Sequence, residues 1–280
     1  MKKLITFSLF FCLLFLSCKS TSITREFYTD PEILSQEILT GSCNEVCAQE
    51  IWTPLPQPGY SITSYKINEI GVTWHCVKID LETANISIIA YPDKNTLGKN
   101  YNLRSLAKKN NAVIAVNTTP FDLDGKTYLP VGITKIENSI ITEPVENYCA
   151  LGFTSTPMRA QIFSTQTDKN TSNCPYVFGG FFSILENGNI ITFAKNKRSR
   201  VGCGISDNGR FLYIMVATPE FHLTDKNGLN YEECAIIFKY LGCTDAMQFD
   251  GGHSSGLVIN GKNVEKPFLQ RKVPTVLLIK

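Results

Sequence analysis

VGCGISDNGRFLYIMVAT, residues 201–218, is the stretch that decides the fold we expect for this chain. Its two apolar runs, Val201 to Ile205 and Phe211 to Thr218, have the length and the β-branched and aromatic content of strands. Asn208-Gly209 lies between them, and this dipeptide favours the tight turn of a β-hairpin. The stretch therefore predicts two neighbouring antiparallel strands.

The same pattern extends in both directions from this hairpin. Asn187-Gly188 and Asn260-Gly261 indicate two more hairpin turns. Antiparallel pairing should therefore be common. The other runs with strand character are Ile70 to Leu81, Ile86 to Tyr91, Ala112 to Val116, Gly132 to Ile136, Tyr176 to Leu185, Ile190 to Phe193, Ala246 to Phe249, Gly256 to Ile259 and Thr275 to Ile279.

Two stretches have the spacing of helices instead. Apolar residues recur at helical intervals from Asn102 to Lys109 and from Tyr231 to Leu241, where Gly242 is a natural C-terminal stop. Each stretch leads directly into an apolar strand. We therefore expect an α+β fold, with a mixed, largely antiparallel β-sheet and a few helices packed on it in a single domain.

Composition narrows the classes of function. The chain has 280 residues, of which 43% are hydrophobic, and a formal net charge of +2 at pH 7. This is enough apolar material for a sizeable core, which argues against disorder. No basic run provides the positive surface that nucleic acids require, so we expect no nucleic-acid partner.

The N-terminus has the features of an export signal. Lys2 and Lys3 precede an apolar stretch from Leu4 to Leu16, which is too short for a comfortable membrane span. Cys18 follows in a context that resembles the lipobox of bacterial lipoproteins, although an ordinary cleaved signal peptide that contains a cysteine is an alternative. We expect a lipoprotein signal peptide at 1–18, a polar tether at 19–59 and a catalytic domain at 60–280. The mature protein would then be held by lipid at the membrane of the cell envelope.

The cysteines do not have the spacing of a structural zinc site. Export permits disulfides, for which Cys43 with Cys47 and Cys149 with Cys174 are the easiest loop pairs to imagine. The remaining candidates lie in apolar or periodic segments, where a cysteine is more often a small buried hydrophobe. These are Cys203, Cys234 and Cys243.

The strongest local feature is Phe249-Asp250-Gly251-Gly252-His253-Ser254-Ser255. An apolar strand leads into an acid, two glycines and two hydroxyls, which places Asp250 beside backbone N–H groups suited to an anion. Taken alone, the pattern also fits an ordinary Asp-Gly turn.

Over about the last two hundred residues the chain resembles the phosphodiester glycosidase family, which includes the enzyme that uncovers mannose 6-phosphate on lysosomal hydrolases. Any one of the motifs is weak, but their order is specific. They are Trp74-His75 with Ile79-Asp80-Leu81, Ala115 to Phe121, Gly179-Gly180-Phe181-Phe182, Arg200 through Gly204-Ile205, Gly228-Leu229 with Glu233-Cys234-Ala235, Asp250-Gly251-Gly252 and Arg271-Lys272-Val273-Pro274. The chain departs from the family pattern at Thr118, Thr119 and Pro120, at Val201, and at His253 and Gly256, which puts substrate preference in doubt more than catalysis.

The resemblance implies hydrolysis of a sugar, commonly N-acetylglucosamine, from a phosphodiester at its anomeric carbon. It implies Asp250 and Glu233 as the catalytic carboxylates. A phosphate monoester is a good leaving group, so one carboxylate would suffice. The substrate-binding candidates are Arg200, Asn117, Gly251, Gly252, His253, Ser254, Ser255 and His75.

Each of these candidates has a simpler alternative role. Arg200 suits two-pronged phosphate binding but equally a solvated strand edge. Asn117 would bind sugar hydroxyls or an acetamido group, or form an Asx turn. His75 would be a proton shuttle or phosphate ligand, or a half-buried strand histidine. His222 has no supporting motif.

Phe121-Asp122-Leu123-Asp124-Gly125 resembles a fragment of a calcium loop, and Asp250 with His253 could ligate a cation. Neither has the full ligand spacing of a known site, so we expect no metal and no cofactor. The sequence thus predicts an exported, lipid-anchored hydrolase that acts on a sugar phosphodiester or envelope glycan. The alternative is a glycan-binding surface lipoprotein with the same fold and no turnover.

Overall fold

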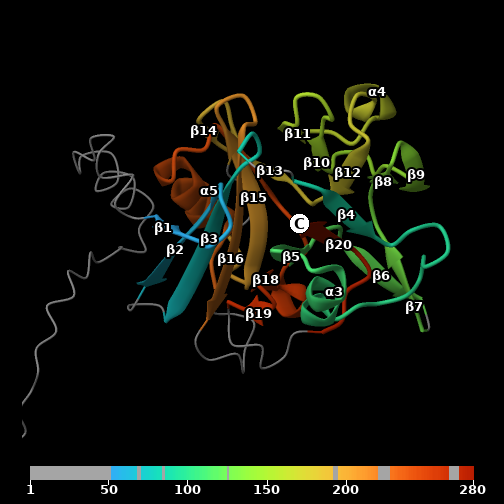
Figure 1. The fold of residues 1–280 in the computed structure, drawn as a ribbon, viewed down its shortest axis with the longest axis horizontal. Helices are drawn as coiled ribbons and strands as arrows, with labels where there is room; N and C mark the ends of the chain where they lie inside the picture. The colour runs from blue at the N-terminus through green and yellow to red at the C-terminus, as the bar shows by residue number, and fades with distance from the viewer. Residues whose placement is uncertain are drawn as a thin grey trace, which may run out of the picture.

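The computed structural model describes residues 52–67, 71–83, 86–124, 126–191, 195–219, 228–264 and 271–280. The predicted signal peptide, Cys18, the pair Cys43 and Cys47, and His222 lie outside these residues. The described strands form three large antiparallel sheets and one two-stranded hairpin (Figure 1). No helix in the described ranges is long and apolar enough to cross a membrane.

An eight-stranded sheet is the largest element, and it contains the hairpin predicted at 201–218. Seven paired residues join its two strands, from Arg200 opposite Ala217 to Ser206 opposite Phe211. In spatial order the strands are β1 (Thr53–Pro54), β2 (Tyr60–Ile67), β3 (Val72–Asp80), β16 (Phe211–Pro219), β15 (Arg200–Ser206), β17 (Asp245–Gln248), β13 (Ser183–Glu186) and β14 (Asn189–Ile190). The sheet therefore begins within the last residues of the stretch predicted as a tether.

Two five-stranded sheets pack against the large one. The first has the order β19 (Lys262–Asn263), β18 (Leu257–Ile259), β5 (Ile114–Asn117), β20 (Val276–Ile279) and β4 (Ile88–Tyr91). The second has the order β11 (Ala160–Phe163), β10 (Ala150–Phe153), β12 (Tyr176–Gly179), β8 (Thr134–Ile136) and β9 (Ser139–Thr142). The small hairpin is β6 (Phe121–Asp124) with β7 (Thr127–Pro130).

The main core lies where the three sheets meet. Val201, Cys203 and Ile205 of β15 point into it, together with buried side chains of β5, β18, β20, β10 and β12. The opposite face of the large sheet is covered by α5 (Tyr231–Tyr240), and α3 (Leu103–Asn110) covers β5 and β18 (Figure 1). Alternate residues of β15 thus face the core and α5, so Arg200, Gly202 and Gly204 emerge on the α5 side.

The expected fold class is confirmed in its main point: the protein is largely antiparallel β-sheet with few helices. Every described strand pair is antiparallel, and the strands form several sheets rather than one. The two predicted helices and the three predicted hairpin turns are present. The sequence patterns missed β1, β2, β6, β7, β9, β10, β11, β19 and the four-residue helix α4 (Asp168–Thr171).

One predicted strand, Tyr176 to Leu185, is two strands in different sheets. β12 ends at Gly179, and β13 begins at Ser183 in the eight-stranded sheet. At the crossing, the N–H of Phe181 donates to the carbonyl oxygen of Gln248 at 2.8 Å. A Cβ at Gly180 would lie 2.5 Å from the same oxygen, so only glycine allows this close approach.

The structure contradicts one of the two disulfides that the sequence suggested. Cys149 and Cys174, imagined as a disulfide pair, are both free and buried. Cys149 belongs to the main core, whereas Cys174 packs in a separate small cluster with Ile133 and Val177. Cys203, Cys234 and Cys243 are buried free thiols, as predicted.

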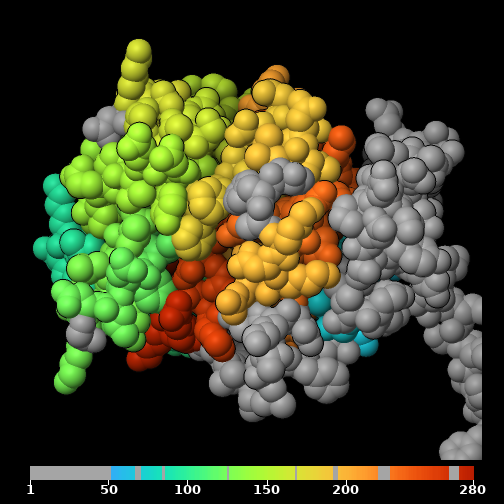
Figure 2. Space-filling model, turned by 180° about the vertical axis from the view of Figure 1, so that it is seen from behind, coloured from blue at the N-terminus to red at the C-terminus, as the bar shows by residue number. Residues whose placement is uncertain are grey.

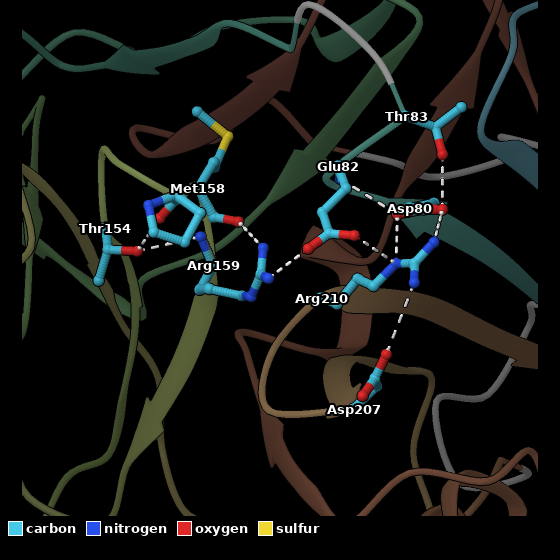
Figure 3. A network of polar contacts seen from close by, with 9 residues as sticks. Asp80, Glu82, Thr83, Thr154, Met158, Arg159, Asp207 and Arg210 are labelled. Atoms are coloured by element: carbon cyan, nitrogen blue, oxygen red, sulfur yellow. Dashed lines mark hydrogen bonds and ion pairs between the residues drawn. The ribbon is translucent and has the colours of Figure 1, made fainter.

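An ion-pair network fastens the end of β3 to two other turns (Figure 3). Arg210, in the β15–β16 turn, donates to both carboxylate oxygens of Asp80, at 3.0 and 2.8 Å. Glu82 joins Arg210 at 3.1 Å and also contacts Arg159 of the β10–β11 hairpin. The network therefore links the large sheet to the second five-stranded sheet.

Candidate active site

The turn that follows β17 is held from two sides. The N–H of Asp250 donates to the carbonyl oxygen of Thr118 at 2.8 Å, and the N–H of Gly252 donates to that of Ser199 at 2.9 Å. Gly252 has a φ of 60° and begins the short 3-10 helix η1 (Gly252–Ser254). A Cβ at Gly251 would lie 2.7 Å from the Ser199 oxygen, so the glycine permits this packing. The turn is thus fixed between the end of β5 and the start of β15.

Asn117 closes the turn rather than facing solvent. Its Nδ2 donates to the carbonyl oxygen of Asp250 at 2.7 Å, and its Oδ1 accepts from the N–H of Gly256 at 3.0 Å. The side chain is 1% exposed. Its donor and its acceptor both hold the two ends of the turn, so Asn117 positions Asp250; the predicted contact with sugar stays a prediction.

Asp250 is the titratable group most altered by its surroundings at this site. Burial raises the pKa of its carboxyl group to about 6, against the opposing effects of Ser254, Arg271 and the backbone of Gly251. Its Oδ2 is buried and makes no hydrogen bond within the described chain. A carboxyl group with this pKa is partly protonated near neutrality, so it can exchange a proton with a substrate or water.

Arg271 completes the turn, and it was not among the predicted site residues. Its Nε donates to Ser254 Oγ at 2.8 Å, and its N–H donates to the carbonyl oxygen of His253 at 3.0 Å. Its Nη2 lies 3.9 Å from Asp250 Oδ2, and its guanidinium lies over the ring of Phe121, 4.5 Å from the centroid. The sequence analysis included Arg271 in the motif Arg271-Lys272-Val273-Pro274 but predicted no role for it.

Arg200 is placed differently from what phosphate binding from solvent requires. It is 6% exposed, and its Nε donates to the carbonyl oxygen of Leu229 at 2.8 Å. Its Nη2 donates to the carbonyl oxygen of Asn196, and its guanidinium lies 4.2 Å from the ring centroid of Tyr231. These contacts hold the start of α5 against β15; phosphate recognition by Arg200 remains a prediction.

Glu233 lies in the first turn of α5, as predicted, and both of its oxygens contact other groups. Oε2 accepts from the N–H of Asn230 at 2.7 Å, and the N–H of Glu233 donates to Asn230 Oδ1, which forms a capping box. Oε1 pairs with Lys197 at 2.8 Å. The catalytic role of Glu233 stays a prediction, and the pKa of Asp250 is raised by burial rather than by repulsion between two carboxylates.

The other predicted residues divide between the turn and the sheet. His253 is exposed at the tip of the turn, whereas Ser254 and Ser255 are buried beneath it. His75 lies in β3, two strands away from β15, where Ser64 Oγ is 2.7 Å from its Nδ1 and burial lowers its pKa. The structure therefore brings the turn residues, Asn117 and Arg271 together but gives His75 other neighbours.

Three buried hydroxyl groups, in the segment after β5 and in the turn after β17, have unmet hydrogen bonds. Within the described ranges, Thr118 Oγ1, Thr119 Oγ1 and Ser255 Oγ are buried without a partner. Buried polar atoms without partners are uncommon in folded proteins, and a functional role is one explanation for them. No three His, Cys, Asp or Glu side chains of these ranges are arranged to hold a metal ion.

The surface also shows the C-terminal part of the chain next to distant segments. On the face in Figure 2, residues near the C-terminus, in red, reach the surface between green and yellow-to-orange parts of the chain. This agrees with the contact between Arg271 and Phe121. Nearby, the proton-exchanging carboxyl group of Asp250 lies 3.9 Å from the guanidinium of Arg271. A carboxyl group beside a cation suits chemistry on an anionic substrate.

Comparisons with known proteins identify a family and a shared fold. The family model described as phosphodiester glycosidase matches residues 110–280. No curated protein matches the chain. The zebrafish N-acetylglucosamine-1-phosphodiester alpha-N-acetylglucosaminidase catalytic domain, auto-inhibited by its pro-peptide, is 18% identical with a TM-score of 0.65, covering 81% of this chain and 85% of that one.

Two further solved structures share the fold. A hypothetical protein from Synechocystis is 13% identical with a TM-score of 0.64, covering 79% of this chain. This chain spans 62% of the length of that protein. A putative exported protein from Burkholderia pseudomallei K96243 is 13% identical with a TM-score of 0.57, covering 74% of each chain. At these identities the structural likeness concerns the fold alone.

Proposed function

Because the chain belongs to the phosphodiester glycosidase family, we propose that it hydrolyses the bond between a sugar's anomeric carbon and a phosphodiester, with Asp250 as the catalytic base. The observation that carries the proposal is the Asp250 carboxyl group, with a pKa raised to about 6 and an arginine 3.9 Å away. The sugar we propose is N-acetylglucosamine or a close relative, as in the enzyme whose fold the chain shares.

Atoms and charges balance in the proposed step. Water attacks the anomeric carbon and gives its proton to the ionised Asp250 carboxylate. The bond from that carbon to the bridging phosphate oxygen breaks, and its electron pair leaves with the phosphate monoester. The sugar gains the hydroxyl group, and the proton passes from Asp250 to solvent. The leaving group is already an anion of low basicity, so the step needs little from a general acid.

Cleavage in water enriched in oxygen-18 tests this proposal. The purified chain should convert a sugar 1-phosphodiester to free sugar and phosphate monoester, with the heavy oxygen in the sugar. A label in the phosphate would instead indicate attack at phosphorus. The matched control is Asp250→Asn, which should lose at least about a hundredfold in turnover, the usual contribution of a general base. If no sugar phosphodiester in a broad panel is cleaved while sugars still bind, the glycan-binding alternative holds.

We also propose that the protein is exported and anchored by lipid at Cys18. The support is the sequence alone: an apolar leader after Lys2 and Lys3, then a polar stretch before the first described strand. Cys18→Ala should move the protein from the membrane fraction to the soluble fraction and remove the lipid mass. A variant that still partitions with membranes at unchanged mass would contradict the anchor.

A further inference from the structure

Two arginines lie near the Asp250 turn, and their exposure separates them. Arg200 is 6% exposed, and its Nε and Nη2 donate to the backbone oxygens of Leu229 and Asn196. The Arg271 side chain is 51% exposed. An anion that enters from solvent can reach the exposed Arg271 directly, whereas Arg200 is almost completely covered by protein.

Arg271 is held in place before any ligand binds. Its backbone N–H is fixed by the oxygen of His253, its Nε by Ser254 Oγ, and its guanidinium plane by the ring of Phe121. Long side chains lose conformational entropy when they bind a ligand, and these three contacts reduce that loss. In the described part of the chain, hydrogen bonds engage only the Nε of its guanidinium, so the four N–H groups of Nη1 and Nη2 remain for a ligand.

Among the residues that the structure describes, the charge of Arg271 is incompletely balanced. Its Nη2 is 3.9 Å from Asp250 Oδ2, which is beyond hydrogen-bonding distance, and that oxygen has no hydrogen-bond donor in the described ranges. A guanidinium in this state can hold an anion on its outer edge while it still faces Asp250. Phosphate oxygens match the two-pronged geometry of that edge.

We infer that Arg271, oriented by Ser254 and Phe121, binds the phosphate of the substrate in place of the buried Arg200. The inference rests on the proposed function for the identity of the ligand, a glycosyl phosphodiester. Bound there, the phosphate brings the anomeric carbon within reach of the water that Asp250 activates, and Arg271 offsets the negative charge that grows on the leaving group. Phe121 is a positioning residue, because it contacts Arg271 and not the ligand.

Binding of inorganic phosphate to the full chain, measured by calorimetry, tests the inference without any turnover. Arg271→Ala should weaken binding at least about tenfold, because charge-assisted hydrogen bonds are lost. Arg271→Lys should weaken it by about threefold to tenfold, because the charge stays but the fork is lost. Lys272→Ala is the matched control, since Lys272 is an exposed neighbouring cation, and it should change the dissociation constant less than about twofold.

Two more variants test whether Phe121 positions Arg271 and whether Arg200 binds phosphate instead. Phe121→Leu should weaken phosphate binding by about threefold, and a thermal transition near that of the wild type would show that the fold is retained. Arg200→Lys should leave phosphate binding unchanged. Wild-type affinity in Arg271→Ala, or a loss found in Arg200→Lys instead, would overturn the inference. If Arg271 governs phosphate binding while no sugar phosphodiester is cleaved, the proposed function fails and this site stands.

Discussion

Asp80 and Asp250 each face an arginine, yet their carboxyl groups respond in opposite directions. Each aspartate side chain is 14% exposed. Asp80 accepts two hydrogen bonds from Arg210, one from Thr83 Oγ1 at 2.5 Å and one from the N–H of Glu82 at 3.1 Å (Figure 3). These bonds, those from Arg210 above all, hold the pKa of Asp80 well below the usual range. Burial instead raises the pKa of Asp250 to about 6.

The difference shows that the presence of a neighbouring arginine does not decide the pKa. Arg210 approaches Asp80 to 2.8 Å with aligned donors, whereas Arg271 stays 3.9 Å from Asp250 and donates to Ser254 instead. Hydrogen bonds to the charged form outweigh the effect of burial at Asp80, whereas at Asp250 burial outweighs the combined effects of Ser254, the more distant Arg271 and the backbone of Gly251. Ser254 therefore keeps Arg271 near Asp250 without letting it neutralise the carboxylate.

The pH dependence of turnover should show the largest effect. Because Asp250 must be ionised to accept the proton of water, kcat/KM should rise about tenfold per pH unit below 6 and level off above about 7. A pH series with one sugar 1-phosphodiester as substrate measures this. Asp80→Asn should have the same profile as the wild type. Activity that falls as the pH rises through 6 would make Asp250 a proton donor instead.

The ionised Asp250 should lower the free energy of unfolding, whereas the ionised Asp80 should raise it. The pKa of folded Asp250 lies above its unfolded value, so its contribution is fully present below about pH 4 and is lost as the pH rises through 6. Asp250→Asn should therefore be more stable than the wild type at pH 7, by on the order of 1–3 kcal/mol. Urea unfolding at pH 5 and pH 7 measures the difference, and a less stable Asp250→Asn at pH 7 would contradict the role of burial.

Asp80 should behave in the opposite way. The pKa of folded Asp80 lies below its unfolded value, so its stabilisation is present above about pH 4 and is lost as the pH falls toward the folded value. Asp80→Asn should lower the free energy of unfolding at pH 7 by about 1 kcal/mol, since solvent screens these partly exposed groups. The deficit should shrink in acid. An equal deficit at pH 3 and pH 7 would mean that packing, not charge, explains it.

Substitution of Glu233 should have the smallest effect on stability. It also tests whether Asp250 is the single catalytic carboxylate. Glu233→Gln keeps a side chain that can complete the capping box with Asn230 and loses only the charge facing Lys197. The free energy of unfolding should fall by less than about 1 kcal/mol. The control is Glu232→Gln, which loses the pair with the exposed Lys195. Turnover lost in Glu233→Gln alone, at wild-type stability, would return Glu233 to the catalytic role that the family resemblance implied.

Local patterns predicted the elements that depend on local chemistry. The hairpin turns at 187–188, 208–209 and 260–261 and the helices α3 and α5 were predicted because Asn-Gly pairs and helical spacing act within a few residues. The split of Tyr176 to Leu185 depends on Gly180 lying against Gln248, a contact between distant parts of the chain that no local pattern shows. The four-residue strands β10 and β11 were also missed, although β5 and β20, of the same length, were predicted.

The candidate site shows the same division between local patterns and contacts over long distances in the sequence. The glycines and Asp250 were identified because a strand that ends in an acid and two glycines is a local pattern. Arg271 was missed as a site residue because its role depends on meeting Ser254 and Phe121 in space. The roles of Arg200 and Glu233 came from the family resemblance and from side-chain chemistry, neither of which reveals that backbone groups of Leu229 and Asn230 engage them.

Because Asn117 joins two sheets at the Asp250 turn, a loss of activity should indicate that the packing between these sheets has loosened. Its one amide group joins the end of β5, in a five-stranded sheet, to both ends of the turn that follows β17, in the eight-stranded sheet. If mild denaturant loosens this junction before either sheet melts, Asp250 loses its orientation while the circular dichroism of the strands persists. Catalysis would then be the first property to disappear on unfolding and the last to return on refolding.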